Sequence, residues 1–286
     1  MAGDDDGHGS LAADPEEHLT AGWEPDVPSD DSLLLATVRN HAGQLRSLGA
    51  TAPYEAAEHP GMALLASGLP HPFVNMAVHL APPDTPDGAA GLDALDGFAA
   101  GHPGVPFLVF CLYGSGDLRA RGYAPVGHPP VMARAAGGEP PPSVTEARGV
   151  TVEEVTDAAT LAVWERTAIT GYPLPELADL PSAAVFDPEL LGSGWRFFLA
   201  RDDADGSPLG TSAAFVSDGL QVLQFVAVLS SARGRGAGAA VSWAASTVEP
   251  DLPAVLVSSD LGRPVYERLG YLSLLRFPLW IATAPG

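Results

Sequence analysis

The sequence predicts a mixed α/β protein of two halves, the second of which has an antiparallel meander followed by a β-α-β crossover. The chain has 286 residues, of which 46% are hydrophobic, so it can bury two domain cores. Two Asp-Gly pairs, at 205–206 and 218–219, separate three β-rich runs that precede an Ala-rich helical run. Because Asp-Gly favours tight hairpin turns, these runs are expected to form three successive antiparallel strands.

A segment rich in Gly and Pro divides the chain at residues 137–147, where no apolar face can form. We therefore expect a linker there, with one domain at residues 32–136 and a second at residues 148–286. Residues 1–31 hold ten acidic residues and no Arg, so they are predicted to form a disordered acidic tail.

The first half is predicted to start with a helix over residues 33–48, which Gly49 ends. Strands are expected at 74–80 and 107–113, and a short helix at 114–122. In the second half, Thr156 or Asp157 can cap the first helix. The elements expected there are strand 149–155, helix 157–169, strands 196–201, 210–217 and 220–229, helix 236–248, strand 254–258, helix 263–269 and strand 272–281.

The composition excludes several classes of function. All 14 cationic residues are Arg, and without a Lys the chain can form neither a Walker phosphate loop nor a Schiff-base site. A net charge of −21 argues against a nucleic-acid partner, because such binding needs cations on the phosphates. The apolar stretches are shorter than the ~18 residues of a membrane span. The single cysteine, Cys111, permits no internal disulfide and fits a reducing interior, so a cytoplasmic location is expected.

A glycine-rich turn at residues 226–238 is the most informative segment of the sequence. An apolar strand, a turn with alternating Gly234, Gly236 and Gly238, and an Ala-rich helix follow one another. Glycine lets a ligand approach the backbone, and the first amides of a helix carry a partial positive charge. Arg233 and Arg235 add two full charges, so the turn is predicted to bind an anion.

Two kinds of anion site compete for this turn. Gly234-x-Gly236-x-x-Ala239 matches a dinucleotide fingerprint, with Asp260 as a ribose-binding acid 26 residues after the first glycine. However, residues 230–233 separate the strand from that glycine, and the preceding strands are expected to be antiparallel. The 48 residues after Gly238 leave no room for the remaining parallel strands. A nicotinamide oxidoreductase is therefore a distant third hypothesis.

The other match is closer. Arg233-x-x-Gly236-x-Gly238, preceded by Val226-Ala227-Val228, resembles the acetyl-CoA motif of the GNAT N-acetyltransferase superfamily. Residues 259–271 resemble the later helix of that family, in which a Tyr, here Tyr266, precedes a Leu-Gly-aromatic ending. The order of the elements expected over residues 149–281 also resembles a GNAT domain.

The resemblance implies a GNAT fold, acetyl-CoA as co-substrate and acetyl transfer to a primary amine of a small-molecule or amino-acid-like acceptor. It implies that Tyr266 is the general acid near the thioester sulfur, and that the N–H group of Val228 polarises the thioester carbonyl. It further implies that the coenzyme is bound by the strand, the loop and the start of the later helical segment: Val226, Ala227, Val228, Arg233, Gly234, Arg235, Gly236, Ala237, Gly238 and Ser259.

The general base is left open by the sequence. Many GNAT members carry a Glu early on the strand before the loop, but Val222, Leu223 and Gln224 stand there in this chain. Asp218 and Asp260 are two candidates for a water-mediated base. The alternatives are an amine that arrives neutral, a base on another element, or a catalytically silent acyl-CoA-binding sensor or interaction protein.

The first half resembles the degenerate half of tandem GNAT proteins. Residues 107–113 and 117–123 resemble the strand, helix and Gly-aromatic ending, and a last strand is expected to begin near Met132, but nothing before them matches the loop motif. This half is expected to pack on the active half and shape the acceptor pocket, with Tyr172 as a further candidate for the lining. The eight His residues show no zinc-ligand spacing, so no metal is expected, and the sequence leaves an oligomeric assembly open.

Overall fold

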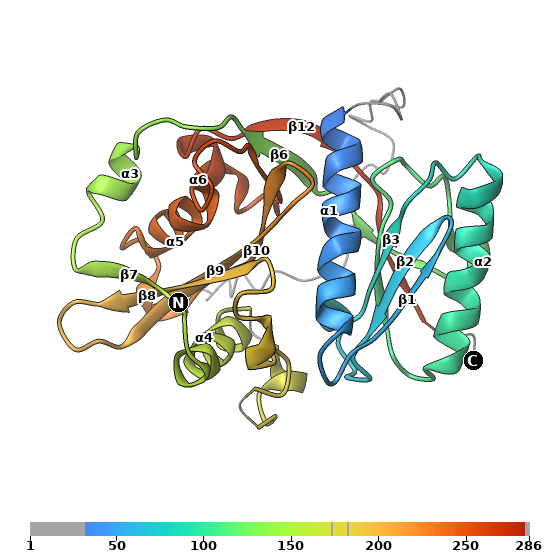
Figure 1. Ribbon diagram of the computed structural model, residues 1–286, viewed down its shortest axis with the longest axis horizontal. Coiled ribbons are helices and arrows are strands. Elements are labelled where there is room, and N and C mark those ends of the chain that lie inside the picture. The colour runs from blue at the N-terminus through green and yellow to red at the C-terminus, as the bar shows by residue number, and fades with distance from the viewer. Residues whose placement is uncertain (1–31, 173, 182, 284–286) are drawn as a thin grey trace, which may run out of the picture.

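The computed structural model describes residues 32–172, 174–181 and 183–283, and the acidic tail expected at 1–31 lies outside this part of the chain. Two mixed sheets stand side by side with helix α1 between them (Figure 1). The predicted mixed α/β class with two halves is confirmed.

The first sheet has six strands in the order β1-β2-β3-β4-β13-β5, with α1 on one face and α2 on the other. Ala63 and Leu65 of β2 pack toward α1, and Met62 and Leu64 pack toward α2, as the alternation of a strand requires. The elements of this half are α1 (Ser32–Gly49), β1 (Glu55–His59), β2 (Met62–Ala66), η1 (Pro72–Val74), β3 (Met76–His79), α2 (Pro86–Gly101), β4 (Phe107–Phe110), η2 (Arg119–Arg121) and β5 (Ala124–Gly127).

The second sheet has seven strands in the order β12-β6-β11-β10-β9-β8-β7. Its elements are β6 (Pro130–Arg134), α3 (Pro142–Thr145), β7 (Val150–Glu154), α4 (Ala158–Gly171), η3 (Pro175–Leu177), η4 (Pro188–Leu190), β8 (Trp195–Asp202), β9 (Pro208–Ser217), β10 (Leu220–Val228), η5 (Ser230–Ala232), α5 (Ala237–Ser246), β11 (Ala254–Val257), α6 (Arg263–Arg268), β12 (Leu272–Arg276) and β13 (Leu279–Ala282).

The predicted meander and crossover are both present in this sheet. Strands β8, β9 and β10 are antiparallel neighbours, and α5 connects β10 to the parallel strand β11. Helix α4 covers one face, on Phe197, and α5 covers the other, on Phe198. Only one pair of strands in this sheet is parallel, so the dinucleotide fold, which needs several parallel strands, is wrong for this chain.

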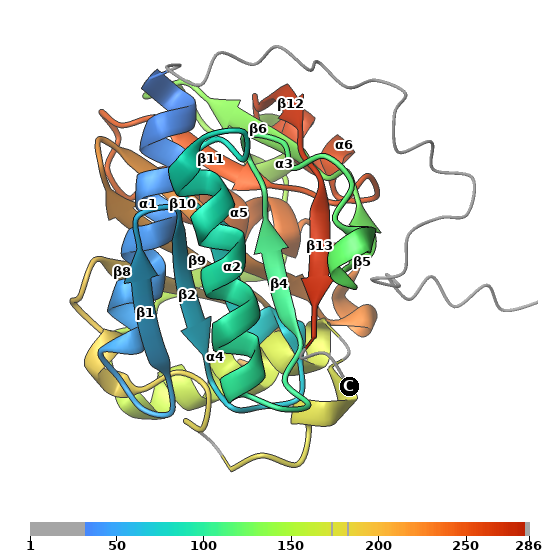
Figure 2. The same cartoon turned by 90° about the vertical axis from the view of Figure 1, so that its right-hand side faces the viewer.

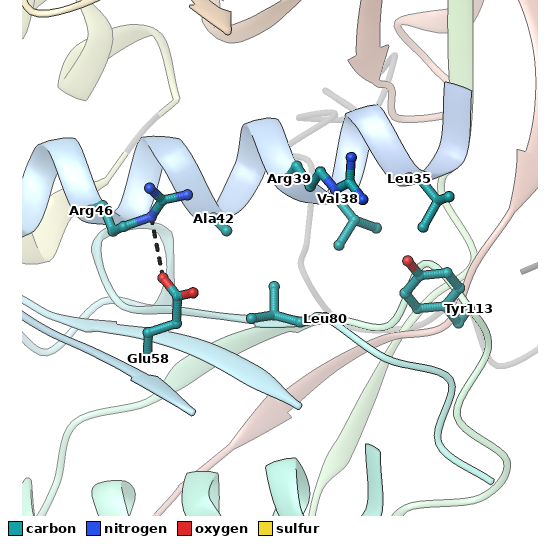
Figure 3. Close-up of a pocket in the computed structure, with 8 residues that line it drawn as sticks. All are labelled: Leu35, Val38, Arg39, Ala42, Arg46, Glu58, Leu80 and Tyr113. Atoms are coloured by element: carbon teal, nitrogen blue, oxygen red, sulfur yellow. Dashed lines mark ion pairs between the residues drawn. The ribbon is translucent and has the colours of Figure 1, made fainter. Parts of the chain in front are cut away.

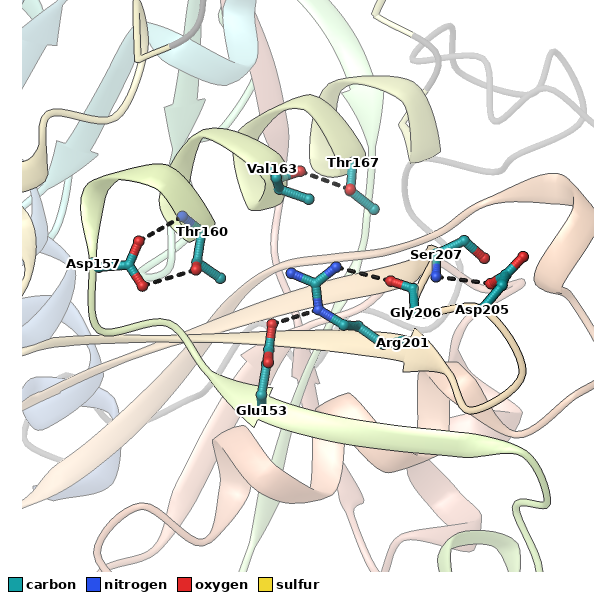
Figure 4. A network of polar contacts seen from close by, with 9 residues as sticks. All are labelled: Glu153, Asp157, Thr160, Val163, Thr167, Arg201, Asp205, Gly206 and Ser207. Carbon is teal, nitrogen blue, oxygen red and sulfur yellow. Dashed lines mark hydrogen bonds and ion pairs between the residues drawn. The ribbon is translucent and has the colours of Figure 1, made fainter.

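Local polar contacts fix the start of α4 and the β8–β9 hairpin (Figure 4). Asp157 caps α4 by accepting from the amide of Thr160 at 2.9 Å, so the second of the two predicted caps is the one used. Glu153 on β7 pairs with Arg201 on β8 at 2.6 Å. In the turn between β8 and β9, Asp205 accepts from the amide of Ser207 at 2.9 Å.

The two halves exchange strands. Strand β6 was expected to end the first half, but it lies in the second sheet between β11 and β12. Strand β13, at the end of the chain, lies in the first sheet between β4 and β5 (Figure 2). Each half thus supplies one strand to the other sheet, so sheet membership does not follow the sequence boundaries at residues 136 and 148.

Three further expectations need correction. The helix expected at 114–122 is a single 3-10 turn, η2, because only Arg119–Arg121 take helical conformation before Gly122. The strand expected at 272–281 is two strands, β12 and β13, because Pro278 interrupts the run. The two strands lie in different sheets. The linker at 137–147 contains α3, and its Ala147 packs against Gly236. The β1–β2 hairpin and α2 were not predicted.

One hydrophobic core connects the halves. Leu45 of α1, Phe110 of β4, Trp164 of α4 and Phe215 of β9 belong to a single cluster of buried side chains. The helix α1 is therefore buried on both sides, and the halves share an interior rather than a thin interface.

Buried His79 is expected to make the protein less stable in acid. It is fully buried at the end of β3, and neither ring nitrogen has a hydrogen-bond partner within the described part of the chain. Burial, and then the charge of Arg121, lower the pKa of His79 from 6.5 to about 4. The unfolded chain therefore takes up this proton first as the pH falls from 6.5 to 4. The stability contributed by the neutral ring is complete above 6.5, and about 3 kcal/mol of it is lost by pH 4.

We expect His79→Leu to remove most of this acid-dependent loss, as measured by urea unfolding at several pH values. His59→Gln, on the exposed end of β1, is the control and should leave the pH dependence of the wild type unchanged. If His79→Leu loses as much unfolding free energy between pH 6.5 and 4 as the wild type does, the titration of another group causes the loss.

Candidate functional site

The site begins where β10 and β11 separate. The two strands pair in parallel only from Gln221 with Ala254 to Leu223 with Leu256. Beyond that point β10 bulges: its register with β9 shifts between Gln224 and Ala227, and Phe225 has a φ of +53°. A bulge bends its strand away from its neighbour. The burial pattern agrees, since residues 224–226 are half-buried in a strand whose first four residues are buried.

The backbone of Val228 faces this gap. The amide of Leu229 donates to the carbonyl of Leu209 at 2.9 Å, so Leu229 faces β9. The carbonyl of Ala227 also faces β9, where it would lie 2.7 Å from a Cβ added to Gly210. Because hydrogen-bonding groups alternate in direction along a strand, the N–H and C=O of Val228 point the other way, toward β11.

The glycine-rich loop follows directly. Gly234 and Gly236 have φ values of +77° and +87°, which disfavour any residue with a Cβ. A Cβ on Gly236 would also lie 2.8 Å from that of Ala147, and a Cβ on Gly238 would lie 3.1 Å from a methyl of Val228. Gly236 is the N-cap of α5 and provides no side-chain cap, so the first amides of the ten-residue helix remain available to a ligand.

The two arginines of the loop differ. Arg235 forms an ion pair with Asp202 at 2.7 Å and donates to the carbonyl of Gly149 at 3.2 Å, so it fastens the loop to β7 and β8. Arg233 is exposed and has no ion-pair partner among the residues that the structure describes. Of the two charges expected at the anion site, Arg233 is the one left free for a ligand.

Tyr266 and Tyr172 lie on opposite faces of the second sheet. Tyr266 lies on α6, on the face covered by α5, and Tyr172 follows α4 on the other face. Burial raises the pKa of Tyr266 to about 12, and the nearby Ser242 hydroxyl opposes part of this rise. Burial also raises the pKa of Tyr172, and the charge of ionised Tyr266 adds to the rise. The charge of one of these two tyrosines therefore affects the pKa of the other.

The side of α4 is close to the same point. A Cβ added to Gly171 would lie 2.8 Å from that of Ala227 and 3.3 Å from the amide nitrogen of Val228. The ring of Tyr172 contacts Phe73 of η1 edge to face, with ring centroids 5.4 Å apart. The first half therefore contributes an aromatic side chain beside Tyr172.

The same arrangement of strands occurs in solved structures. The chain is similar to a GCN5-related N-acetyltransferase from Kribbella flavida, with a TM-score of 0.60 and 23% identity over 87% of this chain and 96% of that chain. It is also similar to a putative acetyltransferase of the GNAT family from Novosphingobium aromaticivorans, with a TM-score of 0.52 and 13% identity over 85% of this chain and 97% of that chain.

A tandem GNAT protein from the clavulanic acid biosynthesis pathway matches with a TM-score of 0.50 and 15% identity, over 90% of this chain and 97% of that chain. The chain has the tandem GNAT fold. No protein-family model and no curated protein matches the sequence, so the likeness is one of structure.

The GNAT fold is repeated in the first half, but without its loop. Strands β3 and β4 are parallel and α2 connects them, as α5 connects β10 and β11. However, β3 pairs with β2 in unbroken register, so it has no bulge. The hydroxyl of Thr85 caps α2 by accepting from Gly88 at 3.1 Å, and Asp87 adds a negative charge to its first turn. This helix start is therefore already capped and carries a negative charge, so the first half lacks the open helix start of the second half.

The two candidate bases are not suitable. Asp218 lies in the β9–β10 turn, ten residues before Val228, which is about 30 Å along the strand from that amide at about 3.3 Å per residue. Asp260 forms an ion pair with Arg276, which lowers the pKa of this carboxylate. Ser259, expected to bind the coenzyme, is exposed and accepts from the amide of Gly262 at 3.1 Å, so its hydroxyl shapes the turn before α6.

A separate cavity of about 240 Å³ lies between α1 and the first sheet (Figure 3). Arg46 on its rim pairs with Glu58 at 3.2 Å, and Arg39 lies near Tyr113. This cavity is on the face of α1 that is turned away from β10. Among the described residues, no group of three or more His, Cys, Asp or Glu could hold a metal ion, and no helix is both long and apolar enough to cross a bilayer.

Proposed function

We propose that this protein transfers the acetyl group of acetyl-CoA to the primary amine of a small-molecule or amino-acid-like acceptor, by direct attack. The observation that carries the proposal is the gap between β10 and β11, toward which the amide of Val228 points, with buried Tyr266 on α6, the helix that follows β11. The uncapped start of α5 lies at the end of β10. A diphosphate and a thioester tether therefore have matching donors in one place.

Each residue has a role in this reaction. The loop amides of residues 234–238 and the guanidinium of Arg233 bind the diphosphate, and the backbone of Val226–Val228 holds the pantetheine arm. The amine nitrogen attacks the thioester carbon, and the N–H of Val228 stabilises the oxyanion that forms. When the C–S bond breaks, Tyr266 gives its proton to the thiolate. The amine gives its surplus proton to solvent, which leaves an amide, free coenzyme A and a phenolate that water reprotonates.

A silent acyl-CoA sensor is the second candidate. The observation that favours it is the lack of a usable carboxylate, since Asp218 is remote and Asp260 is ion-paired. A free thiol assay over a panel of primary amines separates the two. The panel contains amino-acid amides, amino sugars, polyamines and arylalkylamines. Thiol release above the rate without amine supports transfer, and binding without release for every amine supports the sensor.

The coenzyme site is tested by calorimetry. We expect coenzyme A to bind the wild type, and Arg233→Ala to weaken binding by about 10- to 100-fold, because a charge-assisted hydrogen bond contributes about 1.5–3 kcal/mol. Arg39→Ala, an exposed arginine beside the other cavity, is the matched control and should bind as the wild type does. No heat with coenzyme A, or heat with NAD instead, would overturn the proposal.

The cytoplasm is the proposed location, because acetyl-CoA is an intracellular metabolite and Cys111 is a free, buried thiol. Neither a nucleic acid nor a membrane has a part in the proposed reaction.

A further inference from the structure

A chain of side-chain amides joins the first half to the bulge of β10. It begins at Asn40 and continues through Gln44, both on α1, to Gln224 on β10, immediately before the bulge. The Nδ2 of Asn40 donates to the carbonyls of Phe215 and Ser217 at 3.1 and 3.3 Å. These residues lie on the face of α1 opposite to the cavity of Figure 3.

The two backbone carbonyls that Asn40 contacts determine which group donates and which accepts in every hydrogen bond of this series of amides. A carbonyl only accepts, so Asn40 must present its NH₂ group to them and its Oδ1 to Gln44. Gln44 then donates to that oxygen at 2.8 Å and presents its own Oε1 to Gln224. Gln224 in turn must donate, and its Nε2 lies 3.0 Å from Oε1 of Gln44. The backbone therefore decides which atom of Gln224 faces α1.

The protonation of the His41 ring independently indicates the same orientation of the Gln224 amide, with its nitrogen toward α1. Its Nδ1 lies 2.8 Å from the carbonyl of Thr37, so Nδ1 carries the proton and Nε2 has a free lone pair. Burial lowers the pKa of His41, which keeps the ring neutral at pH 7. The Nε2 of Gln224 is 3.5 Å from this lone pair. Both groups that face the amide nitrogen of Gln224 are acceptors.

The side-chain oxygen of Gln224 is not used by this network of hydrogen bonds. No described residue donates to its Oε1, and Gln224 is the first half-buried residue of β10 after four buried ones. It precedes the bulge that opens the gap with β11. We propose that Oε1 of Gln224 accepts a hydrogen bond from the acceptor amine, and that Gln44 and His41 of the first half are positioning residues that keep this oxygen turned toward the site. This assignment rests on the proposed function.

The chemistry of an amide limits what Gln224 does. An amide oxygen accepts a hydrogen bond but does not take up a proton near neutral pH, so Gln224 orients the amine nitrogen without deprotonating it. The attacking amine must then be neutral when it binds. We therefore expect kcat/KM to rise with pH according to the pKa of the free amine, whichever amine of the panel is used.

Two substitutions of Gln224 test the assignment with the panel amine that has the highest kcat/KM. Gln224→Met keeps the length of the side chain and removes the acceptor, and we expect KM for the amine to rise about five- to tenfold at unchanged kcat. Gln224→Glu places a carboxylate opposite two acceptors, so KM should rise at least as much. A gain of activity at low pH in Gln224→Glu would overturn the proposal, because it would show that the position serves a base.

The positioning role and the fold need their own controls. Gln44→Met should raise KM for the amine about threefold at unchanged kcat, whereas a merely structural role would lower only the Tm. Gln221→Met is the matched control, since the amide of Gln221 is fully used by the carbonyls of Ser246, Glu249 and Leu252 at the other end of β10. It should lower the Tm and leave KM unchanged.

The outcomes also separate this inference from the proposed function. If the wild type binds coenzyme A and releases thiol, and Gln224→Met has the KM of the wild type, the assignment of Gln224 is wrong and the proposed function stands. If the wild type does not bind coenzyme A, or binds it and acetylates no amine, the proposed transfer and the assignment of Gln224 both fail.

Discussion

Tyr266→Phe is expected to lower kcat by about 10²-fold or more, because a positioned general acid typically contributes 10² to 10⁴. The pKa of Tyr266 is raised to about 12 by burial, so the hydroxyl is protonated at every pH at which the protein is assayed. It can therefore protonate the leaving thiolate without a preceding ionisation step. The measurement is thiol release at saturating amine, with the Kd for coenzyme A measured alongside, which we expect to be unchanged.

Tyr271→Phe is the matched control for this prediction. Tyr271 is buried beside Tyr266, with ring centroids 5.9 Å apart, but its hydroxyl is bonded to that of Ser246 at 2.6 Å. Removing it should cost about 1 kcal/mol of stability and leave kcat within a few-fold of the wild type. Equal activity of Tyr266→Phe and wild type would refute the acid assignment, and a similar loss in both variants would indicate a packing effect.

The second half was largely predictable because its local signals agree with its tertiary structure. The Asp-Gly turns produced the meander, Asp157 capped α4, and Gly236 took the positive φ that the loop requires. The position of the glycine-rich loop before α5 could therefore be predicted from residues alone. The role of Arg235 could not, because its partner Asp202 is 33 residues away in sequence.

The bulge at Phe225 and the amide chain to Gln224 were not visible in the sequence. A bulky residue at positive φ has no sequence signature, since the surrounding sheet imposes the conformation. The side chains of Gln224 and Gln44 are 180 residues apart in sequence, and only the packing of α1 on β10 brings them together. The signal that could have indicated the contact is the face of α1 formed by Asn40, His41 and Gln44, whose polar side chains are all fully buried.

The exchange of β6 and β13 is the largest departure from the sequence-based domains. Strands of similar apolar character fit either sheet, so their composition does not say which sheet they join. Pro278 marks the break between β12 and β13, but a proline only ends a strand and does not direct the next one. Because of the exchange, the first half cannot complete its sheet without the last strand of the chain, and this has a measurable consequence.

Trp280→Ala is expected to lower the free energy of unfolding by about 3–5 kcal/mol, the usual cost of removing a large buried aromatic side chain. Trp280 is 4% exposed on β13, within the core between the first sheet and α2. Its indole nitrogen donates to the hydroxyl of Ser115 at 2.9 Å, so the variant also loses this hydrogen bond, while that hydroxyl keeps its own bond to the carbonyl of Gly116. Urea unfolding measures the loss, and hydrogen exchange of β4 and β5, which flank β13, locates it.

Trp243→Ala provides the comparison, since Trp243 on α5 is only half-buried and lies under the guanidinium of Arg134 at 4.3 Å. Loss of such a contact costs about 1–2 kcal/mol, so this variant should unfold later in urea than Trp280→Ala. Because β13 is the central partner of β4 and β5, the fastest exchange in Trp280→Ala is expected in those strands, although the substituted residue is near the C-terminus. Exchange that increases only in β10, β11 and β12 would mean that the last strand stays with the half that precedes it in sequence.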